Sequence, residues 1–135
     1  KTIIPNMISR RSGHIINISS IAGKETYENG VVYCASKKAV ESISQGMRLE
    51  LTKHDIKVSN IAPGSVETEF SEVRFKGNKE KACLVYKDYS PLLAEDVSDL
   101  ISYILSCPER VTIADVTILP KKQSSSTVVY KNKKL

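Results

Sequence analysis

A tyrosine and a lysine, Tyr33 and Lys37, lie four residues apart in a stretch with helical spacing of its apolar residues. Residues at this spacing stand one above the other on one helix face, which brings an ammonium group close to a phenol. A phenol, with a pKa of about 10, is a poor base at neutral pH, but a neighbouring cation stabilises the phenolate. The pair could therefore exchange a proton with a hydroxyl or carbonyl group.

Ser20, upstream of this pair, follows an apolar β-branched run and could donate a hydrogen bond to the same reacting oxygen. Each residue also has a simpler interpretation. Tyr33 could be a half-buried aromatic, Lys37 a solvated charge on a helix, and Ser20 a turn former at the end of a strand. Chemistry is indicated only if the surrounding elements bring the three side chains together.

The elements that must position these residues alternate along the chain. Apolar runs predict strands, and apolar residues at three- and four-residue spacing predict helices, in the order 14–19, 32–53, 57–62, 94–107 and 111–119. Strands joined by helices of this length predict an α/β fold with a doubly wound parallel sheet. Ligands of such sheets bind beyond the carboxyl ends of the strands, where Ser20 and the Pro63-Gly64 turn fall.

Three segments lie outside this alternation. Residues 1–13 indicate the end of a helix and a turn, so we expect the chain to begin within a fold. Residues 65–91 are polar, with a weak helical pattern, and are interpreted as a mobile segment over a site. Residues 121–135 are rich in Ser and Lys and are predicted to form a basic, solvated tail.

Three motifs, in their order and spacing, resemble those of the short-chain dehydrogenase/reductase family. NISSIAG, YCASK and NIAPGSVET are similar to the NxSS, YxASK and PGxVxT motifs of that family. The resemblance implies that Ser20 positions the substrate oxygen and that Tyr33 is the general acid/base. It also implies that Lys37 supports the tyrosine and, with it, holds the nicotinamide ribose.

The third motif implies a cofactor contact as well. In the family, the proline-glycine turn and the residues after it contact the nicotinamide carboxamide, largely through backbone groups. The resemblance therefore assigns Pro63, Gly64, Val66 and Thr68 to the cofactor. Thr68 could instead be a plain helix N-cap.

Longer segments resemble the NADP-dependent 3-hydroxy acid dehydrogenases of fungi and bacteria, namely ETEFSEVRFKGN, VYKDYSPLLAEDVSDLISYIL and IADVTILPKKQSS. The resemblance implies NADP as hydride acceptor, with NAD as the alternative, and a small 3-hydroxy acid as substrate. Arg74 is the candidate partner of the substrate carboxylate because a guanidinium matches a carboxylate with two parallel hydrogen bonds. A solvated loop arginine is the alternative.

The glycine-rich TGxxxGxG turn, which in the family binds the cofactor phosphates, does not occur in the sequence. We therefore interpret residues 1–120 as the C-terminal part of a single Rossmann-type domain and residues 121–135 as the tail. The isolated chain is expected to be inactive, and the complete enzyme to be a homodimer or homotetramer. The alternative is a non-catalytic remnant that acts as an interaction domain, using the helix predicted at 32–53.

Composition excludes several other classes. Five of the twenty basic residues follow residue 120, so residues 1–120 hold equal numbers of acidic and basic side chains, which argues against nucleic-acid binding. No apolar run is long enough for a membrane span. The two histidines and three cysteines lack metal-ligand spacing, so no metal site is predicted. A cytoplasmic protein is expected.

Overall fold

The apolar runs form a parallel β-sheet in the computed structural model, which describes residues 2–74 and 76–131. Strands β1 (Gly13–Ile18), β2 (Ile56–Pro63) and β3 (Asp115–Ile118) lie in the order β1-β2-β3. Both pairings are parallel. Strand β2 is central and almost wholly buried, whereas β1 is half-exposed, with one edge that pairs with no strand among the described residues.

The third strand is shorter than the predicted run, 111–119. After Pro108 the chain makes a turn in which the Val111 amide donates to the Pro108 carbonyl over 2.8 Å. Backbone hydrogen bonding to β2 begins only at Ala114, whose carbonyl accepts from the Asn60 amide over 2.9 Å. The β-branched residues before that point therefore belong to the turn and its exit.

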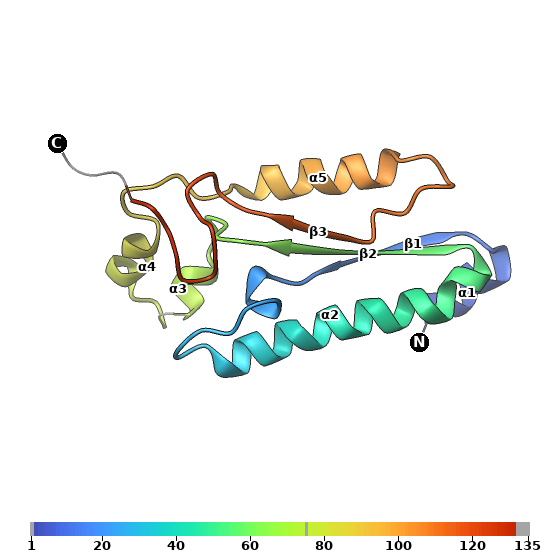
Figure 1. Ribbon diagram of the computed structural model, residues 1–135, viewed down its shortest axis with the longest axis horizontal. Coiled ribbons are helices and arrows are strands. Elements are labelled where there is room, and N and C mark those ends of the chain that lie inside the picture. The colour runs from blue at the N-terminus through green and yellow to red at the C-terminus, as the bar shows by residue number, and fades with distance from the viewer. Residues whose placement is uncertain (1, 75, 132–135) are drawn as a thin grey trace.

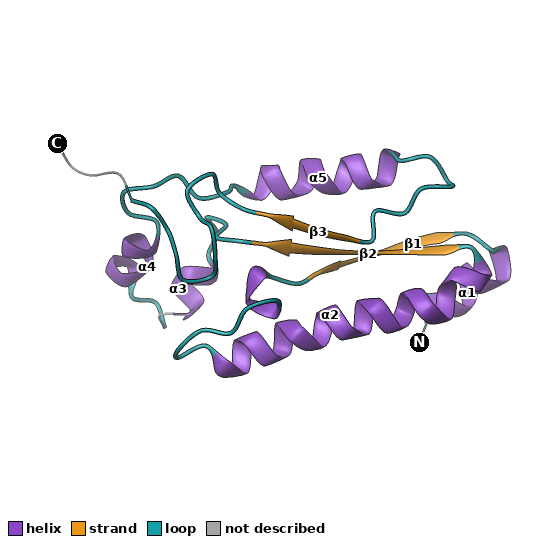
Figure 2. Ribbon diagram, in the orientation of Figure 1, coloured by secondary structure: helices purple, strands orange, loops and turns teal. Residues whose placement is uncertain are grey.

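Helices α2 (Val31–Leu51) and α5 (Ala94–Ser106) lie on opposite sides of the sheet (Figures 1 and 2). The three layers confirm the predicted α/β, Rossmann-like class. The connection from β1 to β2 through α2 and the connection from β2 to β3 through α5 both move in the same direction across the sheet. Because α2 and α5 lie on opposite sides of the sheet, the two connections have opposite hand. One crossover is therefore an exception to the usual right-handed rule.

Apolar and polar contacts together hold α2 against the sheet. Leu51, Ile56 and Val58 form a buried cluster, which the short N-terminal helix α1 (Ile4–Arg10) covers with partly buried apolar side chains. Along the same interface, Arg48 of α2 forms an ion pair with Asp115 of β3 over 2.6 Å. These contacts fix the height of α2 relative to the strand ends.

Apart from η2, the remaining elements gather at the carboxyl end of the sheet, on the left in Figure 1. A 3-10 helix, η1 (Ile21–Gly23), follows β1, and another, η2 (Thr52–His54), extends α2 at its opposite end. Residues 65–91 contain two short helices, α3 (Phe70–Arg74) and α4 (Lys79–Val85). Their predicted mobility stays a prediction. Within the described residues, no helix combines the length and the apolar character that a membrane span requires.

Part of the predicted solvated tail is ordered in the structure. Residues 120–131, which we call the strap, fold back along the carboxyl end of the sheet. The strap closes on itself through an antiparallel bridge between Gln123 and Val129, and Gln123 is only 7% exposed. Backbone hydrogen bonds and one buried amide therefore order part of this polar segment, although most of its residues are exposed or half-buried, and the interpretation of residues 121–135 as a basic polar tail stays a prediction. Lys133 and Lys134 lie outside the described residues.

Candidate active site

A cavity of 640 Å³ opens at the carboxyl ends of β1 and β2. It lies where the topology of a parallel sheet predicts a ligand site. The structure brings all the site residues predicted from the sequence to the wall of this one cavity: Ser20, Tyr33, Lys37, Pro63, Gly64, Val66, Thr68 and Arg74.

Ser20 connects the end of β1 with the turn after β2. Its hydroxyl oxygen accepts from the amide of Ala22 over 3.2 Å and so caps η1. The same hydroxyl donates to the carbonyl of Pro63 over 3.4 Å. Ser20 is thus the turn former of the simpler interpretation and also a cavity residue, with a long hydrogen bond that a better acceptor could replace.

Tyr33 and Lys37 occupy the first two turns of α2. The Lys37 ammonium lies 5.9 Å from the centre of the Tyr33 ring, and it donates to the carbonyl of Ile18 over 3.1 Å. A Cβ atom on Gly23 would lie 2.8 Å from the Lys37 carbonyl oxygen. Only glycine therefore lets η1 come this close to α2, and this approach holds the lysine beside the end of β1.

The segment after β2, which we call the proline-glycine turn (residues 63–67), is held by hydrogen bonds on several sides. The Gly64 amide donates to the Ile118 carbonyl over 2.8 Å. The Leu92 amide donates to the Ser65 carbonyl over 2.9 Å, and the Leu92 carbonyl accepts from the backbone amide of Glu67 over 2.8 Å. The turn is therefore fixed to β3 on one side and to the entry of α5 on the other.

Val66 lies between Ser65 and Glu67, the two residues whose backbone groups are hydrogen-bonded to Leu92. The Val66 carbonyl accepts from the Tyr86 hydroxyl over 2.9 Å. Among residues 2–74 and 76–131, the Val66 amide N–H has no hydrogen-bond acceptor. Because Val66 lines the cavity, this amide is a donor available to a ligand.

Thr68 lies just before α3 and also lines the cavity, so its assignment to the cofactor stays a prediction. Its hydroxyl oxygen accepts from the amide of Phe70 over 3.3 Å, at the start of α3. This contact helps to bring Phe70 toward Tyr33, and the centres of their rings lie 5.4 Å apart. The aromatic wall beside Tyr33 therefore comes from α3.

Arg74, at the end of α3, lies over the face of Tyr27, with 5.7 Å between the guanidinium carbon and the ring centre. Burial raises the pKa of the Tyr27 phenol, while the charge of Arg74 and its hydrogen bond to the phenol partly oppose that rise. Both residues also line an adjoining cavity of 430 Å³, together with Tyr33 and Phe70. Arg74 is thus exposed but oriented by an aromatic face.

Several cavity residues escaped the sequence interpretation: Tyr27, Phe70, Gln123, Ser126 and Val129. Tyr27 and Phe70 are single aromatics within polar segments, and that isolation is a weak signal that could have found them. The strap residues carry no such signal, because nothing in a Ser- and Lys-rich segment indicates which amide becomes buried. In the described part of the chain, no group of three or more His, Cys, Asp or Glu residues could hold a metal ion.

The sequence pattern of the short chain dehydrogenase family matches residues 1–79, which is more than half of the chain. The parallel sheet and the cavity at its carboxyl end agree with that match. The chain belongs to the short-chain dehydrogenase family.

Several curated relatives share the name NADP-dependent 3-hydroxy acid dehydrogenase. That of Schizosaccharomyces pombe is 40% identical over 131 residues, which are 97% of this chain and 51% of the relative. That of Escherichia coli is 40% identical over 125 residues, or 92% of this chain and 50% of the relative. The chain thus spans about half the length of the curated relatives it matches.

Solved structures also match the chain over about half of their own length. The closed form of a serine dehydrogenase complexed with NADP+ superposes with a TM-score of 0.89 at 38% identity, covering 97% of this chain and 53% of that one. A serine dehydrogenase from Escherichia coli superposes with a TM-score of 0.72 at 32% identity, covering 90% and 46%.

Proposed function

We propose that this chain forms the substrate-facing half of an NADP-dependent dehydrogenase that oxidises the hydroxyl group of a small 3-hydroxy acid. The observation that carries the proposal is the single 640 Å³ cavity in which Ser20, Tyr33 and Lys37 meet the proline-glycine turn. Relatives named for NADP and for 3-hydroxy acids, at 40% identity, support the cofactor and the substrate class. NAD is the alternative cofactor.

The residues present fit the nicotinamide end of such a cofactor. The Val66 amide is a donor suited to the oxygen of a carboxamide, while Tyr33 and Lys37 would hold the ribose. Gly64 has no space for a side chain, since a Cβ atom there would meet Leu119 at 2.9 Å and would also contact Gln123. When bound, NADP would accept the hydride that leaves the substrate carbon.

The proton of the substrate hydroxyl would pass to the phenolate oxygen of Tyr33. The Lys37 ammonium, one helical turn away, stabilises that phenolate. Ser20 would turn its hydroxyl from the Pro63 carbonyl toward the substrate oxygen and hold it while the carbonyl double bond forms. The products are a 3-oxo acid, a proton on Tyr33 and a hydride on the cofactor, which balances the two-electron oxidation.

Arg74 would hold the carboxylate of the acid. Its guanidinium lies over the Tyr27 ring, at the wall of the cavity, and a guanidinium group can match a carboxylate with two parallel hydrogen bonds. Because Arg74 and Tyr33 line the same cavity, one small acid could contact both.

The test uses the natural protein that carries this chain. Tyr33→Phe should lower kcat for a 3-hydroxy acid by about 10²–10⁴-fold, because the group that takes the proton is lost. The Kd for NADP, measured by calorimetry, should change far less than kcat, by about tenfold at most, because phenylalanine loses only one hydrogen bond to the ribose. Tyr103→Phe is the matched control, since Tyr103 is 63% exposed on α5 and lies outside the cavity. Undiminished turnover in Tyr33→Phe would overturn the proposed mechanism.

Exposed apolar side chains on α2 favour a second function, the binding of another protein chain. Val32 is 84% exposed and Leu49 is 80% exposed, at opposite ends of the helix. Burial of such side chains against a second copy would give a homodimer or homotetramer. Sedimentation of Leu49→Lys should show a smaller assembly than that of the wild type, and an unchanged mass would exclude the surface of α2 around Leu49.

A further inference from the structure

The strap contains a glutamine whose two amide atoms are both engaged. Gln123 accepts through Oε1 from the Ser65 amide over 2.8 Å, and donates through Nε2 to the Ser125 carbonyl over 3.1 Å. Its side chain is buried, and its own amide donates to the Pro120 carbonyl over 3.0 Å. A residue 58 positions away in the sequence thus holds the proline-glycine turn.

This contact fixes the orientation of one peptide group in the turn. A trans peptide is planar, with its N–H and C=O pointing in opposite directions, and the structure has no cis peptide bond in its described part. Holding the Ser65 N–H therefore also sets the direction of the Gly64 carbonyl. The next peptide, which carries the available Val66 N–H, is held at its Ser65 carbonyl by the Leu92 amide over 2.9 Å, so Gln123 and Leu92 together fix two consecutive peptides of the turn.

The other part of the strap is fixed across the cavity. Ser126 donates from its amide and from its hydroxyl to the Glu25 carboxylate, over 2.9 and 3.0 Å. Glu25 belongs to the loop that follows η1 and leads to Tyr27. The strap therefore connects the loop on the Ser20 side of the cavity with the turn on the β2 side, and Gln123, Ser126 and Val129 line the space between them.

We propose that Gln123 is a positioning residue, which holds the proline-glycine turn in the conformation that receives the nicotinamide end of the cofactor. The inference rests on the proposed function, because it assigns the turn to the cofactor. Gln123 acts through Ser65 and does not touch the reacting atoms. Its effect falls on cofactor affinity, while the proton transfer at Tyr33 is unaffected once the cofactor is bound.

The experiment compares Gln123→Leu with Gln45→Leu in the natural protein that carries this chain. Leucine has similar size but cannot accept from the Ser65 amide, so the KM for NADP should rise about tenfold, the consequence of one half-buried unsatisfied donor. The KM for the 3-hydroxy acid and the kcat at saturating NADP should stay within about twofold. Gln45 is exposed on α2, and its replacement should change none of these constants.

Gln123→Glu retains an acceptor for the Ser65 amide and loses only the donor to Ser125. Its KM for NADP should rise less than that of Gln123→Leu. If the side chain of Gln123 only filled space, the two variants, which have side chains of similar size, should have similar KM values. This variant also serves if Gln123→Leu fails to fold. An unchanged KM for NADP in the folded variants, or an equal rise in both KM values with a lower Tm, would overturn the inference.

The result that would overturn the proposed function differs from the result that would overturn the inference on Gln123. Absence of any turnover of 3-hydroxy acids by the wild-type protein would overturn the proposed function, whatever the strap variants do. In that case the calorimetric Kd for NADP still decides the inference. A Kd raised about tenfold in Gln123→Leu, but not in Gln45→Leu, supports it, and equal values refute it.

Discussion

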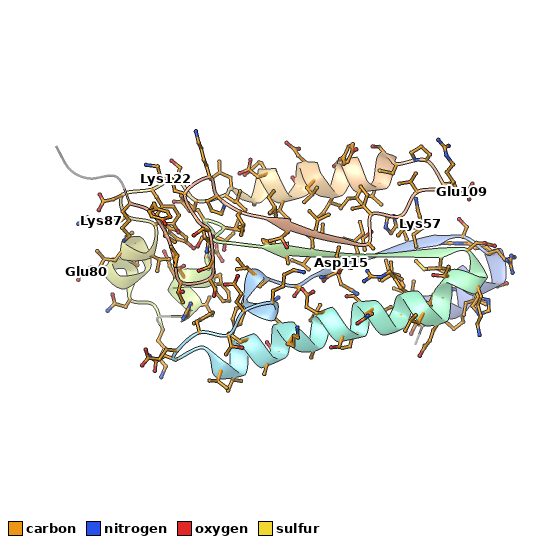
Figure 3. All side chains as sticks on the ribbon, in the orientation of Figure 1. Lys57, Glu80, Lys87, Glu109, Asp115 and Lys122 are labelled. Carbon is orange, nitrogen blue, oxygen red and sulfur yellow. The ribbon has the colours of Figure 1, made fainter. Side chains whose placement is uncertain are left out.

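Two cavities lie at opposite ends of the sheet, and the larger one is not where the chemical groups meet. The cavity at the amino ends of the strands has a volume of 820 Å³, against 640 Å³ at the carboxyl ends. Figure 3 shows Lys57 and Glu109 at the first end and Lys122 of the strap at the other. The direction of the strands therefore identifies the candidate active site better than the volume of the cavity does.

The polar groups of the two cavities also differ in how they are satisfied. At the amino end, Arg11 pairs with Asp55 over 2.5 Å, and His14 shares a hydrogen bond of 2.8 Å with Ser59. Burial, and then the charge of Lys57, lower the pKa of His14 and disfavour its charged form. These groups satisfy one another. At the carboxyl end, by contrast, the Val66 amide has no acceptor within the described residues.

If the carboxyl-end cavity is the active site, Lys37→Ala should have the largest effect among the next four changes. Loss of the ammonium removes both the support of the Tyr33 phenolate and a contact to the ribose, so kcat should fall by about 10²-fold or more and the Kd for NADP should rise. Steady-state kinetics and calorimetry measure the two effects. Lys38→Ala, the exposed neighbour, should match the wild type. If Lys37→Ala lowered kcat but left the Kd for NADP unchanged, the proposed contact between Lys37 and the cofactor would be wrong.

The second change tests the substrate side of the same cavity. Arg74→Ala should raise the KM for a 3-hydroxy acid about tenfold or more, because the carboxylate loses a charged partner, and should leave the Kd for NADP unaltered. Arg74→Lys should recover part of the loss. A KM equal to that of the wild type would return Arg74 to the interpretation as a solvated arginine.

The third change concerns Glu41, which lies between the two ends. Burial alone would raise the pKa of this carboxyl, but hydrogen bonds from Ser19 and Asn60 and the charge of Lys24 outweigh burial and hold it below its ordinary value of 4.5. A lowered pKa stabilises the fold above pH 4.5, and this contribution is lost as the pH falls through the folded-state pKa.

Urea unfolding of wild type and Glu41→Gln across the acid range measures that contribution. The variant should be less stable near pH 7 by about 1–3 kcal/mol, the loss of hydrogen bonds to a charged group, and the difference should shrink toward acid. A difference that does not change with pH would mean that the carboxylate charge is not what stabilises this contact.

The smallest effect is expected at the amino end. Arg11 and Asp55 are 61% and 59% exposed, so solvent screens their attraction. Arg11→Ala should cost no more than about 1 kcal/mol of unfolding free energy and should leave kcat/KM unchanged. A loss of activity comparable to that of Lys37→Ala would break the distinction between the two ends.

Much of this arrangement could be predicted from local patterns. A short apolar run indicated the central strand, and apolar residues at three- to four-residue spacing indicated α2. A parallel sheet then gathers the ends of its strands at one edge. For that reason Ser20, far from Pro63 in the sequence, could be placed beside it.

The remainder depends on contacts that have no local pattern. The residues before β3 have strand-forming side chains, but the turn at Pro108 occupies them. Gln123 is one polar residue among many, and only its long-range bond to Ser65 distinguishes it. The aromatic face of Tyr27 is likewise recognisable only once α3 brings Arg74 over it.

The position of the strap in the sequence has a consequence for biosynthesis. A ribosome makes Ser20, Tyr33, Lys37 and the proline-glycine turn well before it reaches Gln123. A nascent chain that has emerged only as far as α5 therefore holds its reactive residues beside a turn whose Ser65 amide still lacks the Gln123 acceptor. Maturation of the cofactor-binding surface would thus come later in synthesis than the assembly of the groups that transfer the proton.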